Sequence, residues 1–442
     1  MRFNDRRHAR YGGKSFLRAR IVRSRTAFKI LDRTNRLTRP APSQYPDGMT
    51  ALPFLDLADP TFSTRSPAVA AARAESWCAR TPYGLAVLRW REAGALLRDR
   101  RLRQGSHGWP AKVGLEGPFA EFWMRSVIAK EGRDHRSLRD VIVPALSPDF
   151  VAAKTPIFEA IAEDLCDAME AASPCEFQET FAAPFAGRAV AAMLGLRGDG
   201  WAEMAADAQS LGLAMGVDAP RWRERIDAAY LRLDALGRRL IADARAGRGE
   251  DGLVARMTRR FDDAGGSPDL ALRDLAVMAV FGGVDTTASQ LGLALALFFE
   301  RPDQWRAMRE DPALADRAVE EAIAARPTTT WVTREAVEDF EFEGVDVKAG
   351  ETIHVLVHAT GRDPAANEGP AFDLFAPRKK HFGFGGGAHH CVGHLVARAD
   401  IAAAFRALAR RFERIEPDGP AEFRPDSGNT GAWRLPVRPI RA

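Results

Sequence analysis

The stretch HFGFGGGAHHCVGHLVARAD, residues 381–400, joins a glycine-rich loop to a single cysteine and a following helix. Gly385, Gly386 and Gly387 allow tight backbone conformations and a close approach to a ligand. We expect Cys391 to lie at the N-terminus of a helix over residues 395–413. The helix dipole and the free N–H groups there favour a thiolate over a thiol. A thiolate in this position is suited to ligating a metal ion.

Other kinds of site fit this loop less well. A zinc site built from Cys391 with His389, His390 or His394 needs four ligands, and the sequence shows no second Cys or His cluster. Covalent heme attachment requires CxxCH, and a phosphate-binding loop requires GxxxxGK[ST]. Neither pattern is present. On chemistry alone, an inert buried cysteine stays open as an alternative.

A long apolar segment upstream has an unusual centre. Ser267, Pro268 and Asp269 form an N-cap followed by proline, and the helix is expected to run to about Glu300, roughly 45–50 Å at 1.5 Å per residue. A membrane span fits that length, but a central aspartate costs about 2.5–3.5 kcal/mol on insertion. We therefore predict a buried core helix over this segment, whose middle is AVMAVFGGVDTTASQLGLALALFF, residues 276–299.

Two adjacent glycines interrupt this helix beside an acid and two hydroxyls. Gly282 and Gly283 each cost about 1 kcal/mol relative to alanine in a helix interior. The cost indicates a bulky group against the backbone there. A close helix–helix contact is the alternative explanation.

The rest of the chain is predicted to be mainly α with small β-sheets. Residues 66–325 are mostly helical in pattern, and residues 225–247 form an amphipathic helix that ends at Gly247. Residues 331–358 change to β-branched alternation, with turns at Gly344 and Gly350, and read as short strands.

Charge and cysteine content restrict the function. The chain has 63 Lys and Arg and 59 Asp and Glu, but residues 1–48 hold 13 of the former and three of the latter. Residues 49–442 therefore carry 50 basic and 56 acidic side chains, a net charge of −6. That balance argues against nucleic-acid binding by the body of the protein. Four cysteines form no disulfide framework, which indicates a cytoplasmic protein.

We predict a basic N-terminal extension, residues 1–48, and one catalytic domain, residues 49–442. The extension lacks the apolar stretch of a secretory signal. Three interpretations fit it: a disordered basic arm, a targeting peptide, or upstream sequence read from a wrong start codon, with Met49 as the true start.

The pattern FGGGAHHCVG, residues 384–393, resembles the heme-binding signature FGxGxHxCxG of the cytochrome P450 family. Further stretches resemble the family in the expected order, and the resemblance covers residues 60–440. It implies the fold of a bacterial-type heme-thiolate monooxygenase, with a long central helix crossing the heme. The additional matching stretches are GRDHRSLR (132–139), GGVDTT (282–287) and the strand region 333–364.

The resemblance also implies the roles of individual residues. Cys391 would be the axial ligand of heme b (iron protoporphyrin IX), where an electron-rich sulfur promotes O–O cleavage. Backbone N–H groups after Cys391 would hydrogen-bond the sulfur. The other implied cofactor contacts, which hold the propionates or shape the loop, are His135, Arg139, Arg334, His389, Phe384, Gly385 and Gly393.

Thr286 and Asp285 match the family's alcohol and acid pair. The reaction needs two protons delivered to the bound oxygen, and a hydroxyl beside a carboxylate can supply that path. The pair favours electrons and O2 over peroxide. Since the chain has no flavin or iron–sulfur motif, electrons are expected from a separate ferredoxin and ferredoxin reductase. Arg378, Lys379 and Lys380 are candidates for the docking surface, with a solvated charge run as the alternative.

One position departs from the family pattern. Glu321 fits the glutamate of the Glu-x-x-Arg motif, but position 324 is alanine, and Arg326 lies about 200° further around a helix. Either another base pairs with Glu321 or heme retention is weakened, because an unpaired buried carboxylate is costly.

The substrate is expected to be a small, mostly apolar organic molecule, and the protein a monomer without a membrane span. Aromatic residues of the region 105–125 and the loop 208–216 are weak candidates for the pocket. Alternatives to the monooxygenase are a heme protein without turnover, a peroxide-driven peroxygenase and a zinc protein. The individual residues predicted to contact substrate are Val280, Phe281, Gly282, Val284, Trp331 and Thr430.

Overall fold

The computed structural model describes residues 52–59, 61–196, 198–216, 219–248, 251–266, 268–367, 369, 372–426 and 428–442. These residues belong to one compact unit. The proposed N-terminal extension, residues 1–48, lies outside the described residues, as does the predicted N-cap Ser267. The domain division at residue 48 therefore stays a prediction.

Helices form most of the structure, as predicted from the alanine- and leucine-rich periodicity. In chain order the α-helices are α1 Pro67–Glu75, α2 Trp90–Leu96, α3 Trp109–Val113, α4 Pro118–Arg125, α5 Gly132–Ala145, α6 Pro148–Ala171, α7 Ala183–Leu194, α8 Trp201–Gly212, α9 Arg223–Arg245, α10 Leu253–Asp263, α11 Leu270–Glu300, α12 Pro302–Glu310, α13 Leu314–Ala325, α14 Val357–Gly361 and α15 His394–Arg411.

Strands are short and gather in small sheets. They are β1 Cys78–Thr81, β2 Gly84–Val87, β3 Leu102–Gln104, β4 Cys175–Glu176, β5 Trp331–Ala336, β6 Phe340–Phe342, β7 Val345–Val347, β8 Thr352–Leu356, β9 Phe412–Pro417, β10 Glu422–Phe423, β11 Ala432–Arg434 and β12 Pro436–Arg441.

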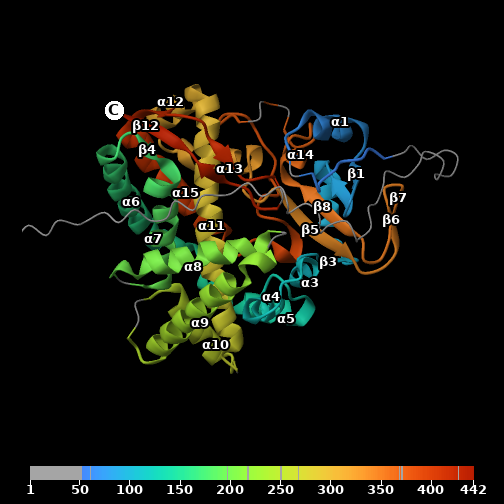
Figure 1. Cartoon of the computed structure of the whole chain (residues 1–442), viewed down its shortest axis with the longest axis horizontal. Helices are drawn as coiled ribbons and strands as arrows, with labels where there is room; N and C mark the ends of the chain where they lie inside the picture. The colour runs from blue at the N-terminus through green and yellow to red at the C-terminus, as the bar shows by residue number, and fades with distance from the viewer. Residues whose placement is uncertain are drawn as a thin grey trace, which may run out of the picture. The chain divides into compact units, whose positions relative to one another are not determined.

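The largest sheet has the order β1-β2-β8-β5-β3, in which only β2 and β8 run parallel. Its central hairpin, β5 with β8, places Arg334 opposite Ile353. Gly344 and Gly350 adopt positive φ angles of 76° and 83° at the two turns predicted for this region. The sheet lies to one side of the helical part (Figure 1). The strand prediction for residues 331–358 is confirmed, except that α14 begins at Val357.

Helix α11 passes through the middle of the helical part (Figure 1) and contacts α7, α8, α9 and α13. Its second half is buried on nearly every side, from Thr287 to Phe298. An apolar helix of this kind forms because packing replaces water around the whole circumference. The predicted core helix is thus confirmed, with Asp269 as its N-cap.

Two further helix predictions are also confirmed. Helix α9 matches the amphipathic segment, and Gly247 beyond its end has φ of +67°. Helix α15 follows the glycine-rich loop and packs along α6, with ion pairs such as Arg406–Glu159 and Arg410–Glu163 across the contact. The loop before α15 is thereby held against the core.

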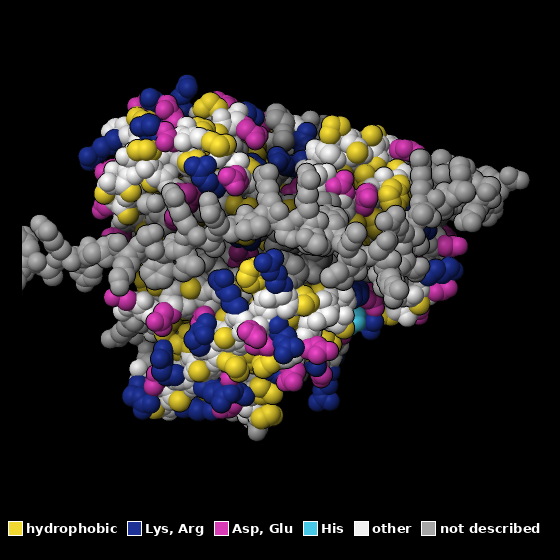
Figure 2. All heavy atoms as spheres, viewed as in Figure 1, with side chains coloured by type: hydrophobic (Ala, Val, Ile, Leu, Met, Phe, Trp, Pro, Cys, Tyr) yellow, Lys and Arg dark blue, Asp and Glu magenta, His cyan; other side chains and the backbone are white. Residues whose placement is uncertain are grey.

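Within the described residues, no single helix is long and apolar enough to cross a membrane. One pair, α5 with α6, passes that test together by length and composition, and it is bent by 54°. On the face shown in Figure 2, basic and acidic side chains are interspersed rather than segregated.

Candidate active site

The glycine-rich loop takes a shape that other residues cannot adopt. Gly385 and Gly387 both have φ of +68°, which L-residues with side chains rarely reach. A Cβ at Gly387 would lie 2.1 Å from the carbonyl oxygen of Leu97, so the loop sits directly on the chain after α2. The Cys391 N–H donates to the Phe384 carbonyl at 2.9 Å and closes the loop. The sequence around the cysteine therefore fixes the position of its sulfur.

The electrostatic setting of Cys391 differs from the prediction. Burial raises the pKa of the Cys391 thiol, while the Gly393 N–H and the charges of Arg139 and Arg398 lower it, and burial prevails. Cys391 lies two residues before Gly393, the N-cap of α15. The expectation that this helix terminus makes the protein alone favour a thiolate is therefore wrong. A metal cation bound to the sulfur would supply the missing positive charge, because a coordinating thiol is deprotonated.

Despite its depth, the Cys391 side chain has accessible surface. Phe384 lies beside the same loop, with the Arg398 guanidinium 4.6 Å from its ring centre. Gly393 donates its N–H to the sulfur, as the resemblance implies. The sulfur is thus held from one side by loop and helix and remains reachable from the other.

Two of the predicted propionate partners are histidines whose rings lie against each other. The ring centres of His135 on α5 and His389 are 4.0 Å apart. Burial lowers the pKa of His135 to about 4, and neighbouring His389 and Arg139 add to this effect. His389 Nε2 lies 2.9 Å from Glu131, a carboxylate that the sequence reasoning missed. His135 Nε2 is buried and has no hydrogen-bond partner among the residues that the structure describes.

The two predicted arginines are also buried or half-buried near the loop. Arg334 on β5 is 3% exposed and donates to the carbonyls of Thr333 (2.9 Å) and Gly386 (3.0 Å). Among the described residues no carboxylate forms an ion pair with it, and burial lowers its pKa to about 10. Arg139 donates to the His390 carbonyl at 2.9 Å, next to Cys391.

This donor set fits heme. A buried arginine without a carboxylate and a buried imidazole nitrogen without a partner are both costly unless an anion joins them. The two propionates of heme b are anions of the required kind, and a thiolate is a suitable fifth ligand to its iron. His135, His389 and Arg334 would hold the propionates, and Cys391 would hold the iron.

The two adjacent glycines in the middle of α11 have different surroundings. A Cβ at Gly282 would meet no heavy atom within 4 Å outside its own helix, so this position faces open space. A Cβ at Gly283 would lie 2.8 Å from Val190 of α7, which is the close helix contact that the sequence left as an alternative. Thr286 Oγ1 donates to the Gly282 carbonyl at 2.6 Å. The hydroxyl predicted to act in catalysis therefore borders the open position.

Asp285, the predicted acid, is held by a base from the C-terminal region. Arg424, which follows β10, donates to its carboxylate with both terminal nitrogens at 3.1 Å. The segment carrying Arg424 is bound to the chain before β5: the hydroxyls of Thr328 and Thr330 donate to the carbonyls of Thr430 and Gly428, each at 2.7 Å. Asp285 and β5 are thereby connected through the segment from Arg424 to Thr430.

The residues predicted to contact substrate lie in several different places. Val280 and Val284 are buried at 3% and 0% exposure, on the side of α11 opposite Gly282 and Thr286. Phe281 packs edge-on against Trp123, with ring centres 6.3 Å apart. For two further predicted residues the structure gives other contacts: Trp331 rests on His354 with ring centres 5.2 Å apart, and the Thr430 hydroxyl donates to the Arg424 carbonyl.

The departure at position 324 is resolved by a different base. Arg378 makes a bidentate ion pair with Glu321, at 2.8 and 2.7 Å, and the two side chains are 5% and 0% exposed. The first of the two sequence-based alternatives, a rebuilt network around Glu321, is therefore confirmed. The suggestion that Arg378 belongs to an exposed docking surface is wrong, because its side chain is buried; Lys379 and Lys380 are exposed.

Comparisons with known proteins place this arrangement in a family. The family model Cytochrome P450 matches residues 242–436. Luteothin monooxygenase of Streptomyces thioluteus is 35% identical over 398 residues, which is 88% of this chain and 96% of the relative. Nocardicin C N-oxygenase of Nocardia uniformis subsp. tsuyamanensis is 28% identical, covering 82% of this chain and 92% of the relative.

Solved structures of similar fold support the same family. CalO2 superposes with a TM-score of 0.78 at 26% identity, covering 86% of this chain and 99% of that one. CYP105P1 in complex with filipin I gives a TM-score of 0.74 at 27% identity, covering 87% and 99%. Given the cysteine loop, the buried anion partners and these relatives over nearly their whole length, the chain belongs to the cytochrome P450 family.

Proposed function

We propose that this heme-thiolate monooxygenase inserts one oxygen atom from O2 into an apolar organic molecule, with electrons from a separate ferredoxin and its reductase. When bound, heme b supplies the chemistry of oxygen activation. The class of activity is shared by the relatives; the substrate class and the electron source are the proposal. The observation that carries it is the open position at Gly282, bordered by the Thr286 hydroxyl and flanked by Phe281 in the same helix.

The chain's own residues would divide the work as follows. Thr286 would hold a proton donor at the open face, since its Oγ1 is already anchored on the Gly282 carbonyl. Asp285, one residue away, would bring protons from solvent once its carboxylate leaves Arg424. Gly212 at the end of α8 comes within 3.9 Å of the Asp285 carboxyl carbon, measured from an added Cβ, so α8 covers this path.

The proposed pocket is narrower than the sequence indicated. Phe281 and Gly282 are kept as contacts, because they flank the open face of α11. Val332 is added, since it lies two residues before Arg334, on the same face of β5, and is 3.9 Å from a Cβ built on Gly385 of the cysteine loop. An aromatic side chain beside Gly282 and an aliphatic one beside the cysteine loop favour an apolar substrate over a charged one. The relatives named above oxidise luteothin and nocardicin C, by their names.

A cytoplasmic location is also proposed, on the ground that all four cysteines are free. The alternative of a heme protein without turnover rested on the missing arginine at position 324. It is not favoured, because Glu321 pairs with Arg378 instead. A role in nucleic-acid binding is not proposed.

Two neighbouring threonines provide a matched test of the proton path. Thr286→Ala should lower the fraction of consumed reductant that appears as product, with the balance appearing as hydrogen peroxide. Thr287→Ala is the control, because the Thr287 hydroxyl is buried and faces Asp400 at 3.4 Å. Equal coupling in wild type and Thr286→Ala would refute the proposed role of Thr286.

The electron source is tested separately. With 18O2, a ferredoxin, its reductase and NADPH, the product should carry one labelled oxygen. Turnover with hydrogen peroxide but none with O2 and reductant would refute the proposal. A reduced, CO-bound spectrum with the red-shifted band of thiolate-ligated heme checks the cofactor setting before either assay.

A further inference from the structure

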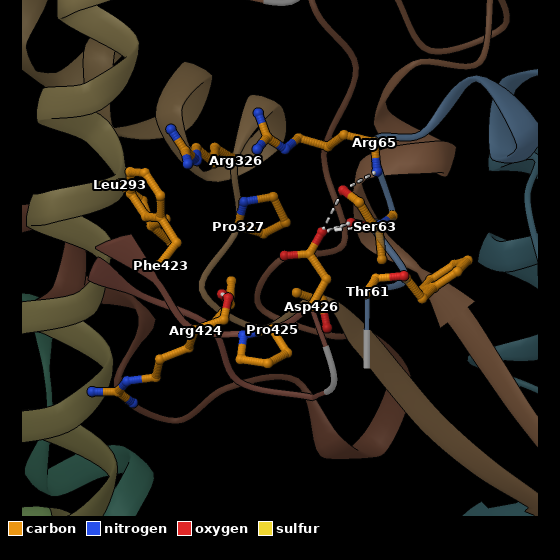
Figure 3. A pocket seen from close by; sticks show the side chains of 14 residues that line it. Thr61, Ser63, Arg65, Leu293, Arg326, Pro327, Phe423, Arg424, Pro425 and Asp426 are labelled. Carbon is orange, nitrogen blue, oxygen red and sulfur yellow. Dashed lines mark hydrogen bonds between the residues drawn. The ribbon is translucent and has the colours of Figure 1, made fainter. Parts of the chain in front are cut away.

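A cavity at the C-terminal half of α11 is lined partly by polar and charged groups. Its volume is about 200 Å³, and its walls come from the chain before α1, from α11, from the connection between α13 and β5, and from the segment after β10 (Figure 3). The space is large enough for a small polyatomic group. None of the proposed heme contacts lines it.

Arg326 is the feature of this cavity that requires explanation. Its side chain is 9% exposed, and within the described part of the chain its guanidinium makes no hydrogen bond. The nearest carboxylate oxygen, on Glu300, is 4.0 Å away and belongs to a side chain that is 61% exposed. The guanidinium lies 4.0 Å from the centre of the Phe423 ring. A largely buried guanidinium with this few partners is costly, because its N–H donors lose most of their contact with water.

A second arginine increases the positive charge. The Arg65 side chain extends across the cavity toward Arg326 (Figure 3). Burial lowers the pKa of Arg326 to about 10, and the charge of Arg65 lowers it further, while the charges of Glu300 and Asp426 raise it. Asp426 does not neutralise them by contact, because its Oδ2 accepts from Ser63 Oγ, Thr64 N and Thr64 Oγ1, each at 3.0 Å.

We propose that this cavity binds a small anion, with its carboxylate or phosphate oxygens between the guanidinium groups of Arg326 and Arg65. Planar guanidinium groups bind such oxygens in pairs. The cavity size fits inorganic phosphate or a short dicarboxylate. This site is additional to the heme pocket, and it does not depend on the proposed substrate.

The anion site is connected to the proposed proton path. Phe423, against which Arg326 packs, directly precedes Arg424, whose side chain holds Asp285. Leu293 in the cavity wall lies seven residues after Thr286, two turns along the same face of α11, or about 10 Å. Gln290 separates the two sites, since its amide bonds the Arg326 carbonyl (3.1 Å) and the Thr328 N–H (3.0 Å). Anion binding at this site would therefore affect the ion pair of Asp285, because residues 423 and 424 connect the two.

Calorimetric titration of the heme-loaded full chain tests the proposal. Sodium phosphate and sodium succinate are titrated separately, at constant ionic strength set with sodium chloride. We expect saturable one-site binding of at least one of them. Arg326→Gln and the exposed Arg65→Gln should each weaken that binding at least ten-fold. Arg91→Gln, at an exposed arginine on α2, is the matched control and should leave the affinity unchanged.

A second measurement distinguishes binding from packing. Saturating anion should raise the unfolding midpoint of the wild type and not that of Arg326→Gln. If Arg326 only packs against Phe423, then Arg326→Gln lowers the midpoint without anion and leaves the anion-induced rise intact, which overturns the proposal. Absence of saturable heat with both anions overturns it as well. Binding of phosphate alone or succinate alone supports it and identifies the oxygen donor.

Discussion

Replacing Arg378 by glutamine leaves the carboxylate of Glu321 buried without its bidentate partner. Glu321 is 0% exposed, and the next cation, Arg317, is 3.6 Å away and 35% exposed. Removing one partner of a buried ion pair costs about 3–5 kcal/mol, because an uncompensated charge is left in the interior. Since Arg317 takes over part of the charge, we expect a loss near the lower end, about 3 kcal/mol in the free energy of unfolding.

Urea unfolding of the holoprotein measures this loss, with helix content followed by circular dichroism and heme retention by the Soret band. Lys379→Gln is the matched control, since Lys379 is the next residue and is exposed. The double variant Glu321→Gln with Arg378→Gln should recover at least half of the loss, because no unpaired charge remains. A loss below about 1 kcal/mol for Arg378→Gln, the ordinary value for an exposed pair, would refute the reasoning.

Three further outcomes are expected. Gly283→Ala should destabilise by about 1–3 kcal/mol through the contact with Val190, whereas Gly282→Ala should leave stability unchanged or slightly raised and alter CO binding; urea titration and CO titration separate the two. Burial lowers the pKa of His354 to about 4 from its ordinary 6.5, so the unfolded chain binds more protons between those values, and stability must fall as pH drops from 6.5 to 4. His354→Phe should reduce that fall by about 3 kcal/mol, at 1.36 kcal/mol per pKa unit, and leave the share of other buried histidines such as His135; an unchanged pH profile would contradict the assignment. Arg334→Gln should speed heme transfer to apomyoglobin at least ten-fold, while Arg91→Gln should not; equal rates would exclude Arg334 as a propionate partner.

Local patterns predicted the parts of this protein whose physics is local. The loop around Cys391 was predictable because its backbone conformation requires glycine. Helix α11 was predictable because its apolar run is too long for a strand. The strands from residue 331 onward follow from alternation interrupted by two glycine turns. In each case the deciding interaction lies within a few residues along the chain.

The incorrect and missing predictions concern groups brought together by the fold. Arg378 is 57 positions from Glu321, and Arg424 is 139 positions from Asp285, so no spacing rule connects them. Glu131 meets His389 across 258 positions. The pKa direction at Cys391 failed for a related reason: the helix terminus is visible in the sequence, but the burial that outweighs it is not.

The threonine contacts between residues 328–330 and 428–430 have a consequence for how the protein opens. They bind the C-terminal segment, which carries the partner of Asp285, to the chain that continues into β5 and Arg334. Segments joined in this way open together as one cooperative unit. Amide hydrogens of β5 and of residues 428–432 should therefore exchange with a common opening free energy. A local fluctuation that released the carboxylate of Asp285 would then also change the stability of β5, the strand that carries Arg334, the proposed propionate partner.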